Sequence, residues 1–174
     1  MIHNNNFIFN PCFKIIDHLN DIIKNNDLII RFIPRNFGLN EYEVFEKKYP
    51  KIKKDLQKIS YENILSNTKI FLSPYLGTGF LETLSMNIPT IIINSKYNEN
   101  IINNHVKEVF EDLKKVKIFF DNEIDLTNHI NSIWENPRNW WENKNLQNAR
   151  ISFCERFAFK NDNKLNDLKN IIIE

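Results

Sequence analysis

The stretch Lys69-Ile-Phe-Leu-Ser-Pro-Tyr-Leu-Gly-Thr-Gly-Phe-Leu-Glu-Thr-Leu-Ser-Met-Asn-Ile-Pro-Thr-Ile-Ile-Ile93 decides the fold of this chain. Residues 69–73 are a short apolar run that predicts a buried strand, and residues 89–93 predict the next one. Between them, Gly77-Thr-Gly79 is typical of a turn, and residues 80–87 predict a short helix. A strand, a turn, a helix and a second strand in this order predict a βαβ unit with parallel strands.

The same alternation extends to both sides of this unit. The pattern predicts helices at residues 11–25, 41–48, 61–67 and 100–115, and strands at residues 27–33 and 116–120. Residues 51–60 are ambiguous and could contain a short strand near Leu56 and Ile59. Residues 123–174 are expected to form a helical extension interrupted at Pro137. We therefore predict an α/β fold, with a Rossmann-like parallel sheet flanked by helices, in a single lobe of residues 1–174.

Composition argues against several classes of protein. The chain has 174 residues, of which 42% are hydrophobic, and this suits one domain with its own core. A net charge of +1 gives no electrostatic reason to expect binding to nucleic acid or to an anionic membrane. No apolar run approaches the roughly 20 residues needed to span a bilayer, and the N-terminus lacks the pattern of a signal peptide. We expect a cytoplasmic protein without a membrane span, with Cys12 and Cys154 reduced.

Neither a metal site nor a bound cofactor is expected. The four histidines, His3, His18, His105 and His129, have no ligand spacing with cysteines or acidic residues. The glycine turn lacks both the Gly-x-Gly-x-x-Gly pattern of dinucleotide-binding folds and the Lys-Ser/Thr pair of a P-loop. Neither dinucleotide binding of that kind nor ATP hydrolysis therefore fits the sequence.

The turn at residues 73–79 is the candidate ligand site. In parallel α/β sheets, ligands bind outside the carboxyl ends of the strands, and this turn lies at such an end. The N–H groups at a helix start are unpaired and carry partial positive charge, and Gly77 and Gly79 would let a phosphate approach them closely. The Thr78 hydroxyl could add a hydrogen bond. Such a site would hold a diphosphate without a metal ion.

Glu82 lies one turn into the predicted helix, where its carboxylate could accept two hydrogen bonds from a ribose diol. A purely structural interpretation stays open for these residues. In it, Gly77 and Gly79 only make a tight turn between a strand and a helix, and Glu82 interacts with the helix dipole.

Three further residues are candidates for donor binding. Arg31 and Arg35 lie on either side of the predicted end of an upstream strand, where a guanidinium group could face the donor phosphates. Arg31 is the stronger candidate, although a surface salt bridge would explain it equally well. Tyr75 could cover the nucleobase, and a packing role is an equal alternative.

The longer segment 73–91 resembles the donor-binding segment of GT-B-type glycosyltransferases. Those enzymes share a turn of small residues, an acidic residue soon after it, and a proline seven positions beyond the acid. Thr78, Glu82 and Pro89 fall in this register. Asn87 stands where that family usually has glycine, and asparagine tolerates the left-handed backbone expected at such a helix end.

One branch of that family resembles this chain over most of its length. Gly77–Leu84 and Asn87–Ile91 look like the same segments of a group of bacterial surface-carbohydrate transferases. Weaker similarity is found at residues 28–34, 140–141, 147–150 and 153–158. Members of that group are several times longer, and this chain corresponds to their C-terminal, donor-binding half.

The resemblance implies transfer of a sugar, or a related group, from a nucleotide-activated donor to a cell-surface glycan precursor. Gly77, Thr78, Gly79 and Glu82 would bind this nucleotide sugar, and Arg31 would stabilise the departing diphosphate. Two alternatives remain open at this stage. The chain could be a non-catalytic nucleotide-binding module that works with a partner chain, or a fragment of a GT-B-like sugar-nucleotide epimerase.

The chain alone is not expected to turn over. GT-B chemistry takes place between two lobes, and the acceptor and its general base usually come from the N-terminal lobe. The helix predicted at residues 11–25 should follow the first strand of the donor lobe, and only Asn6–Phe9 remain to supply that strand. We therefore expect a truncated or split product that carries the binding half of an active site. Its expected partner is a separate N-terminal lobe or a second copy of the chain.

Overall fold

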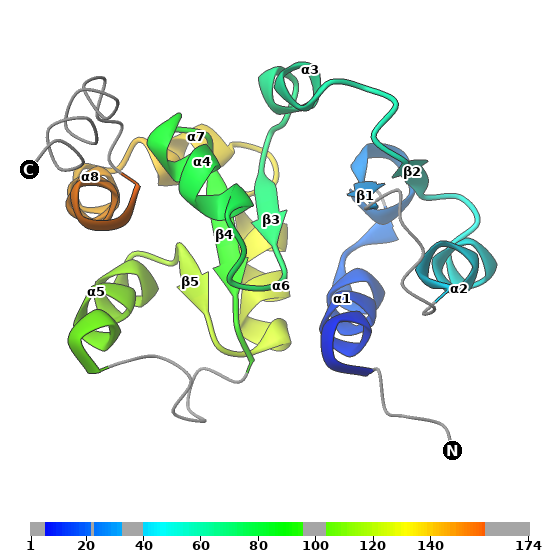
Figure 1. The fold of residues 1–174 in the computed structure, drawn as a ribbon, viewed down its shortest axis with the longest axis horizontal. Coiled ribbons are helices and arrows are strands. Elements are labelled where there is room, and N and C mark those ends of the chain that lie inside the picture. The colour runs from blue at the N-terminus through cyan, green and yellow to red at the C-terminus, as the bar shows by residue number, and fades with distance from the viewer. Residues whose placement is uncertain (1–5, 22, 33–39, 96–103, 159–174) are drawn as a thin grey trace, which may run out of the picture.

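The computed structural model describes residues 6–21, 23–32, 40–95 and 104–158 (Figure 1). The helices are α1 (Asn6–His18), the π-helix η1 (Ile23–Asp27), α2 (Glu41–Lys48), α3 (Tyr61–Ser66), α4 (Gly79–Ser85), α5 (Asn104–Lys115), α6 (Glu123–Ile133), α7 (Pro137–Trp141) and α8 (Lys144–Phe157). The strands are β1 (Ile29–Arg31), β2 (Lys53–Asp55), β3 (Phe71–Ser73), β4 (Thr90–Ile93) and β5 (Phe119–Phe120).

The described strands form two parallel sheets. One has the order β3-β4-β5, and the other pairs β1 with β2. The parallel strands and their helical connections confirm the predicted Rossmann-like α/β fold. The sequence pattern had suggested one continuous sheet, so the division into two sheets is a property of the tertiary structure.

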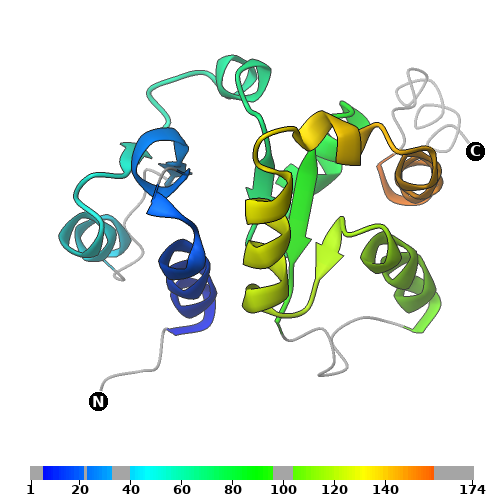
Figure 2. The ribbon, with the colours of Figure 1, turned by 180° about the vertical axis from the view of Figure 1, so that it is seen from behind.

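Helices cover both faces of the three-stranded sheet (Figures 1 and 2). On one face, α4, α5 and α8 pack against Ile92 of β4 and Phe119 of β5. On the other face, α1 and α6 pack against Ile91 and Ile93 of β4 and Phe120 of β5. The side chains of β4 are consequently all buried, as a strand in the middle of a covered parallel sheet requires.

Helices cover only one face of the two-stranded sheet in the described part of the chain. The side chains of Ile30 and Phe32 pack with α1 and α2 in a second core. Ile29 points to the opposite face, since side chains alternate along a strand, and it is 47% exposed. The β1-β2 sheet is therefore buried on one side and open on the other.

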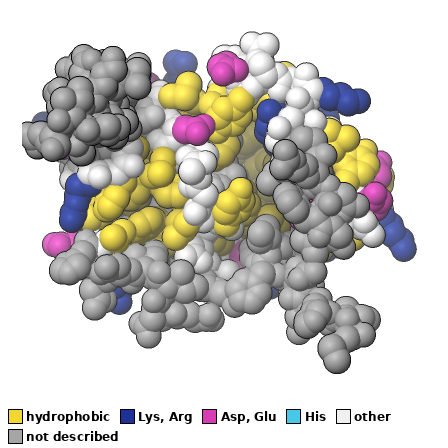
Figure 3. All heavy atoms as spheres, viewed as in Figure 1, with side chains coloured by type: hydrophobic (Ala, Val, Ile, Leu, Met, Phe, Trp, Pro, Cys, Tyr) yellow, Lys and Arg dark blue, Asp and Glu magenta, His cyan; other side chains and the backbone are white. Residues whose placement is uncertain are grey.

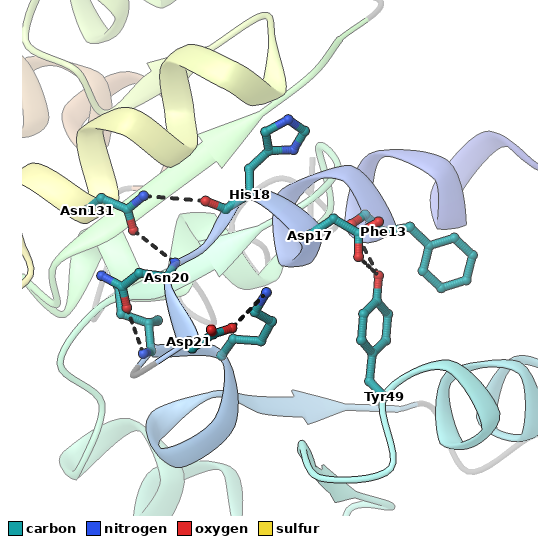
Figure 4. A network of polar contacts seen from close by, with 9 residues as sticks. Phe13, Asp17, His18, Asn20, Asp21, Tyr49 and Asn131 are labelled. Carbon is teal, nitrogen blue, oxygen red and sulfur yellow. Dashed lines mark hydrogen bonds and ion pairs between the residues drawn. The ribbon is translucent and has the colours of Figure 1, made fainter.

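Helix α1 joins the two halves of the fold (Figure 4). Toward the three-stranded sheet, the side chain of Asn131 on α6 accepts from Asn20 N–H and donates to the His18 carbonyl, both at 3.4 Å. Toward the two-stranded sheet, Asp17 accepts a 2.7 Å hydrogen bond from the Tyr49 hydroxyl, which follows α2. One helix thus belongs to both cores.

Two expectations about element positions need correction. The strand expected at Asn6–Phe9 is wrong, because α1 begins at Asn6. A helix pairs its backbone groups within one segment, whereas a strand needs a neighbouring strand. The short strand expected near Leu56 and Ile59 is found instead at Lys53–Asp55, where it pairs with β1.

The helices after β5 are part of the core. Helix α6 lies on one face of the three-stranded sheet and α8 on the other. Trp141 and Phe153 are buried, so both aromatic side chains pack in the core beside the sheet. Among the described residues, every helix is either too short or too polar to cross a lipid bilayer.

Candidate functional site

The predicted ligand turn connects β3 to α4. The Ser73 hydroxyl donates a 2.7 Å hydrogen bond to the Tyr75 carbonyl, and Gly77 N–H donates to the same oxygen at 3.0 Å. Neither Gly77 nor Gly79 has a φ in the left-handed region between +20° and +160°. The role of these glycines therefore lies in the space they leave open rather than in a special backbone conformation.

Tyr75 occupies the space beside Gly77. A Cβ at residue 77 would come within 2.5 Å of the Tyr75 ring, so only glycine lets this ring lie against the turn. The Tyr75 side chain is 50% exposed, so one side of its ring is available to a ligand. Packing and ligand contact are compatible for this residue.

Gly79 opens α4 beside two aromatic side chains. A Cβ at this position would lie 3.5 Å from the Phe71 ring and 3.6 Å from the Tyr61 hydroxyl, which is ordinary van der Waals contact. Thr78, the N-cap residue, is exposed and its side chain makes no capping hydrogen bond. The N-terminal turn of α4 is therefore near two hydroxyl groups, one on Thr78 and one on Tyr61.

Sequence reasoning did not identify Tyr61 as a site residue. It begins α3, whose N-cap Ser60 accepts a 3.3 Å hydrogen bond from Asn63 N–H. No motif or spacing connects residue 61 to the turn at residues 73–79, so only the folded chain reveals that they are neighbours.

Charges around Tyr61 show that the predicted residues converge on it. Burial raises the pKa of Tyr61 above its ordinary value, and the negative charge of Glu82 raises it further. The cation of Arg31 opposes this rise, whereas Tyr75 adds to it. Glu82 itself is exposed in the first turn of α4. The structure thus brings Arg31, Tyr75 and Glu82 into electrostatic contact with one tyrosine.

Arg31 is already engaged by protein groups. Its Nη1 forms an ion pair with the carboxylate of Asp55, which is only 6% exposed, and donates to the Ile59 carbonyl at 3.0 Å. The guanidinium also lies 5.7 Å from the centre of the Tyr61 ring, within range for a cation–π contact. The salt-bridge alternative for Arg31 is therefore present in the structure. Arg35 lies outside the described residues.

A comparison with known protein families matches residues 9–172 to the LIC12162 family transferase. The chain belongs to this family. The matched range includes α1 from residue 9 onward, both sheets and the whole candidate site. No curated protein and no solved structure matches the chain.

Residues of α7 and α8 hold the C-terminal end of α4 by hydrogen bonds. Arg150 Nη1 donates to the Leu84 carbonyl at 2.8 Å, near the C-terminal end of α4. Trp141 Nε1 lies 3.1 Å from the carbonyl oxygen of Asn87 and 3.0 Å from its side-chain oxygen. Asn87 has a φ of 57°, the left-handed conformation expected for it. These contacts hold the C-terminal end of the helix whose N-terminal turn is the candidate site.

A hollow lies along β5 and α6. It measures about 410 Å³, and its lining includes Lys114, Asp121 and His129. The Nε2 atom of His129 is buried there without a hydrogen-bond partner in the described chain. Burial lowers the pKa of His129 to about 4, and the Lys117 cation adds to the shift.

Within the described ranges, no group of three or more His, Cys, Asp and Glu side chains could hold a metal ion. Both cysteines are free thiols. His3 and the side chain of His105 lie outside the described part of the chain.

Proposed function

We propose that this transferase-family chain binds the nucleotide-activated donor of a group-transfer reaction at the turn between β3 and α4. The observation that carries the proposal is the convergence of Gly79, Tyr61 and Glu82. Gly79 starts helix α4 beside the partly buried Tyr61 hydroxyl, and the carboxylate of Glu82 lies close enough to raise the pKa of Tyr61. These are the groups that a nucleoside diphosphate can use.

The proposed roles follow from the chemistry of each group. The first N–H groups of α4, near Gly79, bind the diphosphate, and the hydroxyls of Thr78 and Tyr61 donate to its oxygens. Glu82 accepts hydrogen bonds from the ribose diol. The exposed ring of Tyr75 stacks on the base.

Arg31 acts in this proposal from a fixed position. Asp55 and the Ile59 carbonyl hold its guanidinium against the Tyr61 ring. Asp55 balances the charge of Arg31, so Arg31 contributes less to phosphate binding than a free arginine would. Its main role is to orient Tyr61.

Negative charge builds on the leaving diphosphate as its bond to the transferred group breaks. The first N–H groups of α4 and the hydroxyls of Thr78 and Tyr61 are already in place to stabilise this charge. The group transferred is a sugar or a related group, and its acceptor is a precursor of a cell-surface glycan.

A binding series around Gly79 tests the phosphate site. The Cβ of Gly79→Ala fits the protein without a clash, yet it stands where a phosphate would approach the helix start. We expect UDP, CDP or GDP to bind the parent chain and to bind Gly79→Ala roughly tenfold more weakly by calorimetry. Ser85→Ala is the control, because Ser85 lies in the last turn of α4. Equal nucleotide affinity in Gly79→Ala and the parent would contradict the site.

A second series tests the role of Glu82. Glu82→Ala should cost on the order of 1.5–3 kcal/mol of nucleotide binding free energy, the range for hydrogen bonds to a charged group. The loss should be much smaller for a 2′,3′-dideoxynucleotide, which has no diol to lose. Equal losses with both ligands would show that Glu82 does not bind the ribose.

A further inference from the structure

The hollow along β5 and α6 has the size of a small-molecule site. Its volume of about 410 Å³ falls within the range of roughly 300–1,000 Å³ that is usual for ligand pockets. Strand β5 lies between α5 and α6 in both ribbon views (Figures 1 and 2). Hydrophobic side chains also reach the surface on one face of the molecule (Figure 3), but an apolar surface by itself does not identify a ligand. The hollow is more informative, because charged and polar side chains line it.

His129 of α6 is a buried polar group in the lining of this hollow. Only 6% of this residue is exposed, and its Nε2 atom has no hydrogen-bond partner in the described chain. The imidazole packs against Phe120 of β5 and against Trp140, with ring centres 5.5 and 5.1 Å away. A buried nitrogen without a partner costs free energy, so a polar ligand atom beside the ring would be favourable. The lowered pKa of about 4 keeps this imidazole neutral at pH 7, with one N–H to donate.

Lys117 is the lysine of the lining whose charge acts on His129. Lys114, the other lysine there, forms an ion pair with Asp121. The carboxylate of Asp125 accepts a 2.6 Å hydrogen bond from an asparagine side chain. Lys117 is exposed and forms no ion pair within the described part of the chain. The hollow therefore holds one uncompensated positive charge close to a neutral imidazole.

The backbone at Lys117 supports a role for its side chain. Lys117 has a φ of 63°, in the left-handed region where glycine is favoured. Its N–H donates to the Lys114 carbonyl at 3.0 Å, and the next N–H donates to the Leu113 carbonyl at 2.9 Å, which closes α5. Asn87 occupies the same position after α4, and asparagine tolerates this conformation better than lysine does. The turn after α5 therefore carries a lysine at a conformational cost that a role in binding would explain.

We propose that this hollow binds a small organic carboxylate, whose charge pairs with Lys117 and whose oxygen accepts a hydrogen bond from the imidazole of His129. Phe120 of β5 supplies an apolar wall for the carbon skeleton. A single uncompensated lysine balances one negative charge, whereas Asp121 and Asp125 in the same lining would repel a dianion such as phosphate. The volume leaves room for several carbon atoms besides the carboxylate. No residue of this lining belongs to the proposed nucleotide site.

Titration with benzoate, followed by NMR of the full chain at pH 7, tests this assignment. Benzoate is an aromatic carboxylate that is small enough for the hollow, and benzamide is its uncharged counterpart of nearly the same shape. The imidazole resonances of His129 should move with benzoate in a saturable way. Benzamide should bind about tenfold more weakly, because it lacks the charge that pairs with Lys117. The resonances of His18, which is exposed at the end of α1, should not move.

Two lysine variants separate binding from folding. Lys117→Gly removes the cation and suits the positive φ, so it should raise the melting temperature while weakening benzoate binding about tenfold. Lys115→Gln is the matched control, because Lys115 lies two residues earlier, pairs with Asp112 and is absent from the lining. It should leave the affinity for benzoate unchanged. A lysine with a purely structural role would not produce the opposite changes expected for Lys117→Gly.

Three results would overturn the proposal. The first is the absence of a saturable change at His129 with benzoate. The second is an unchanged benzoate affinity in Lys117→Gly, or equal affinities of the parent for benzamide and benzoate, since either would show that the lysine charge is not used in binding. The third is tighter binding of inorganic phosphate than of benzoate, which would assign the hollow to a different class of anion.

Discussion

Isoleucine runs form a strand in each of the two sheets, but their surroundings differ. In β4, Ile91, Ile92 and Ile93 are fully buried, with helices on both faces and a strand on each side. In β1, Ile29 is 47% exposed, and Ile30 is covered by α1 and α2 from one side. An apolar run therefore predicts a strand, whereas the adjacent strands and covering helices decide how much stability that strand contributes.

The largest expected effect is a difference in the free energy of unfolding between an Ile→Ala substitution in β4 and one in β1. Ile92→Ala removes a fully buried side chain from the central strand and should lower the free energy of unfolding by about 2–5 kcal/mol. Ile29→Ala makes the same chemical change at a half-exposed position and should cost less than about 1 kcal/mol. Urea denaturation of both variants measures the difference.

Equal destabilisation by Ile92→Ala and Ile29→Ala would contradict the difference in burial between the two sheets. It would mean that Ile29 is covered in solution by residues or chains that the structure does not describe.

An intermediate effect concerns pH and His129, which lies beside β5 in the three-stranded half. Burial lowers the pKa of His129 from 6.5 to about 4, so the unfolded chain binds a proton more readily between these values. Its contribution to stability is present above pH 6.5 and is lost as the pH falls toward 4. The loss should amount to at most about 3 kcal/mol, because solvent screening reduces the free energy that the change in pKa represents.

Two histidine variants isolate this effect. His129→Gln should flatten the dependence of unfolding free energy on pH between 6.5 and 4. His18→Gln is the matched control, because His18 is an exposed residue at the end of α1. If the profiles of His129→Gln and the parent have the same slope, His129 is not the group that titrates.

The smallest expected effect concerns the polar contact that holds α1 to the two-stranded half. Hydrogen bonds from Lys48 and Tyr49 outweigh partial burial and lower the pKa of Asp17, and burial raises the pKa of Tyr49 to about 12. Tyr49→Phe removes the 2.7 Å bond to Asp17 and should cost about 0.5–1.5 kcal/mol. Thermal unfolding can measure this change.

Tyr42→Phe is the control for that change, since Tyr42 is exposed on α2 and contacts Phe32 through its ring. Its loss of a hydroxyl should leave the melting temperature nearly unchanged. A shift for Tyr49→Phe no larger than that for Tyr42→Phe would show that the hydrogen bond from Tyr49 to Asp17 contributes nothing measurable to stability.

Local sequence determined most of the elements of this protein. The helix at residues 41–48 was predicted with its observed bounds, and β3, α4 and β4 follow the order read from residues 69–93. Asn87 adopts the left-handed conformation that its residue type favours at a helix end. These features depend on periodicity, turn residues and backbone preference, which act within a few residues.

Contacts between distant residues were decided only by the tertiary structure. The approach of Tyr61 to Gly79, the pairing of Arg31 with Asp55 and the sharing of α1 by two cores join segments that have no common motif. The helical start of α1 at Asn6 and the division of the strands into two sheets also belong here. Hydrogen-bond pairing between strands and packing of side chains from separate elements depend on where the chain returns in space. A pattern within a few residues does not specify which distant segments come together.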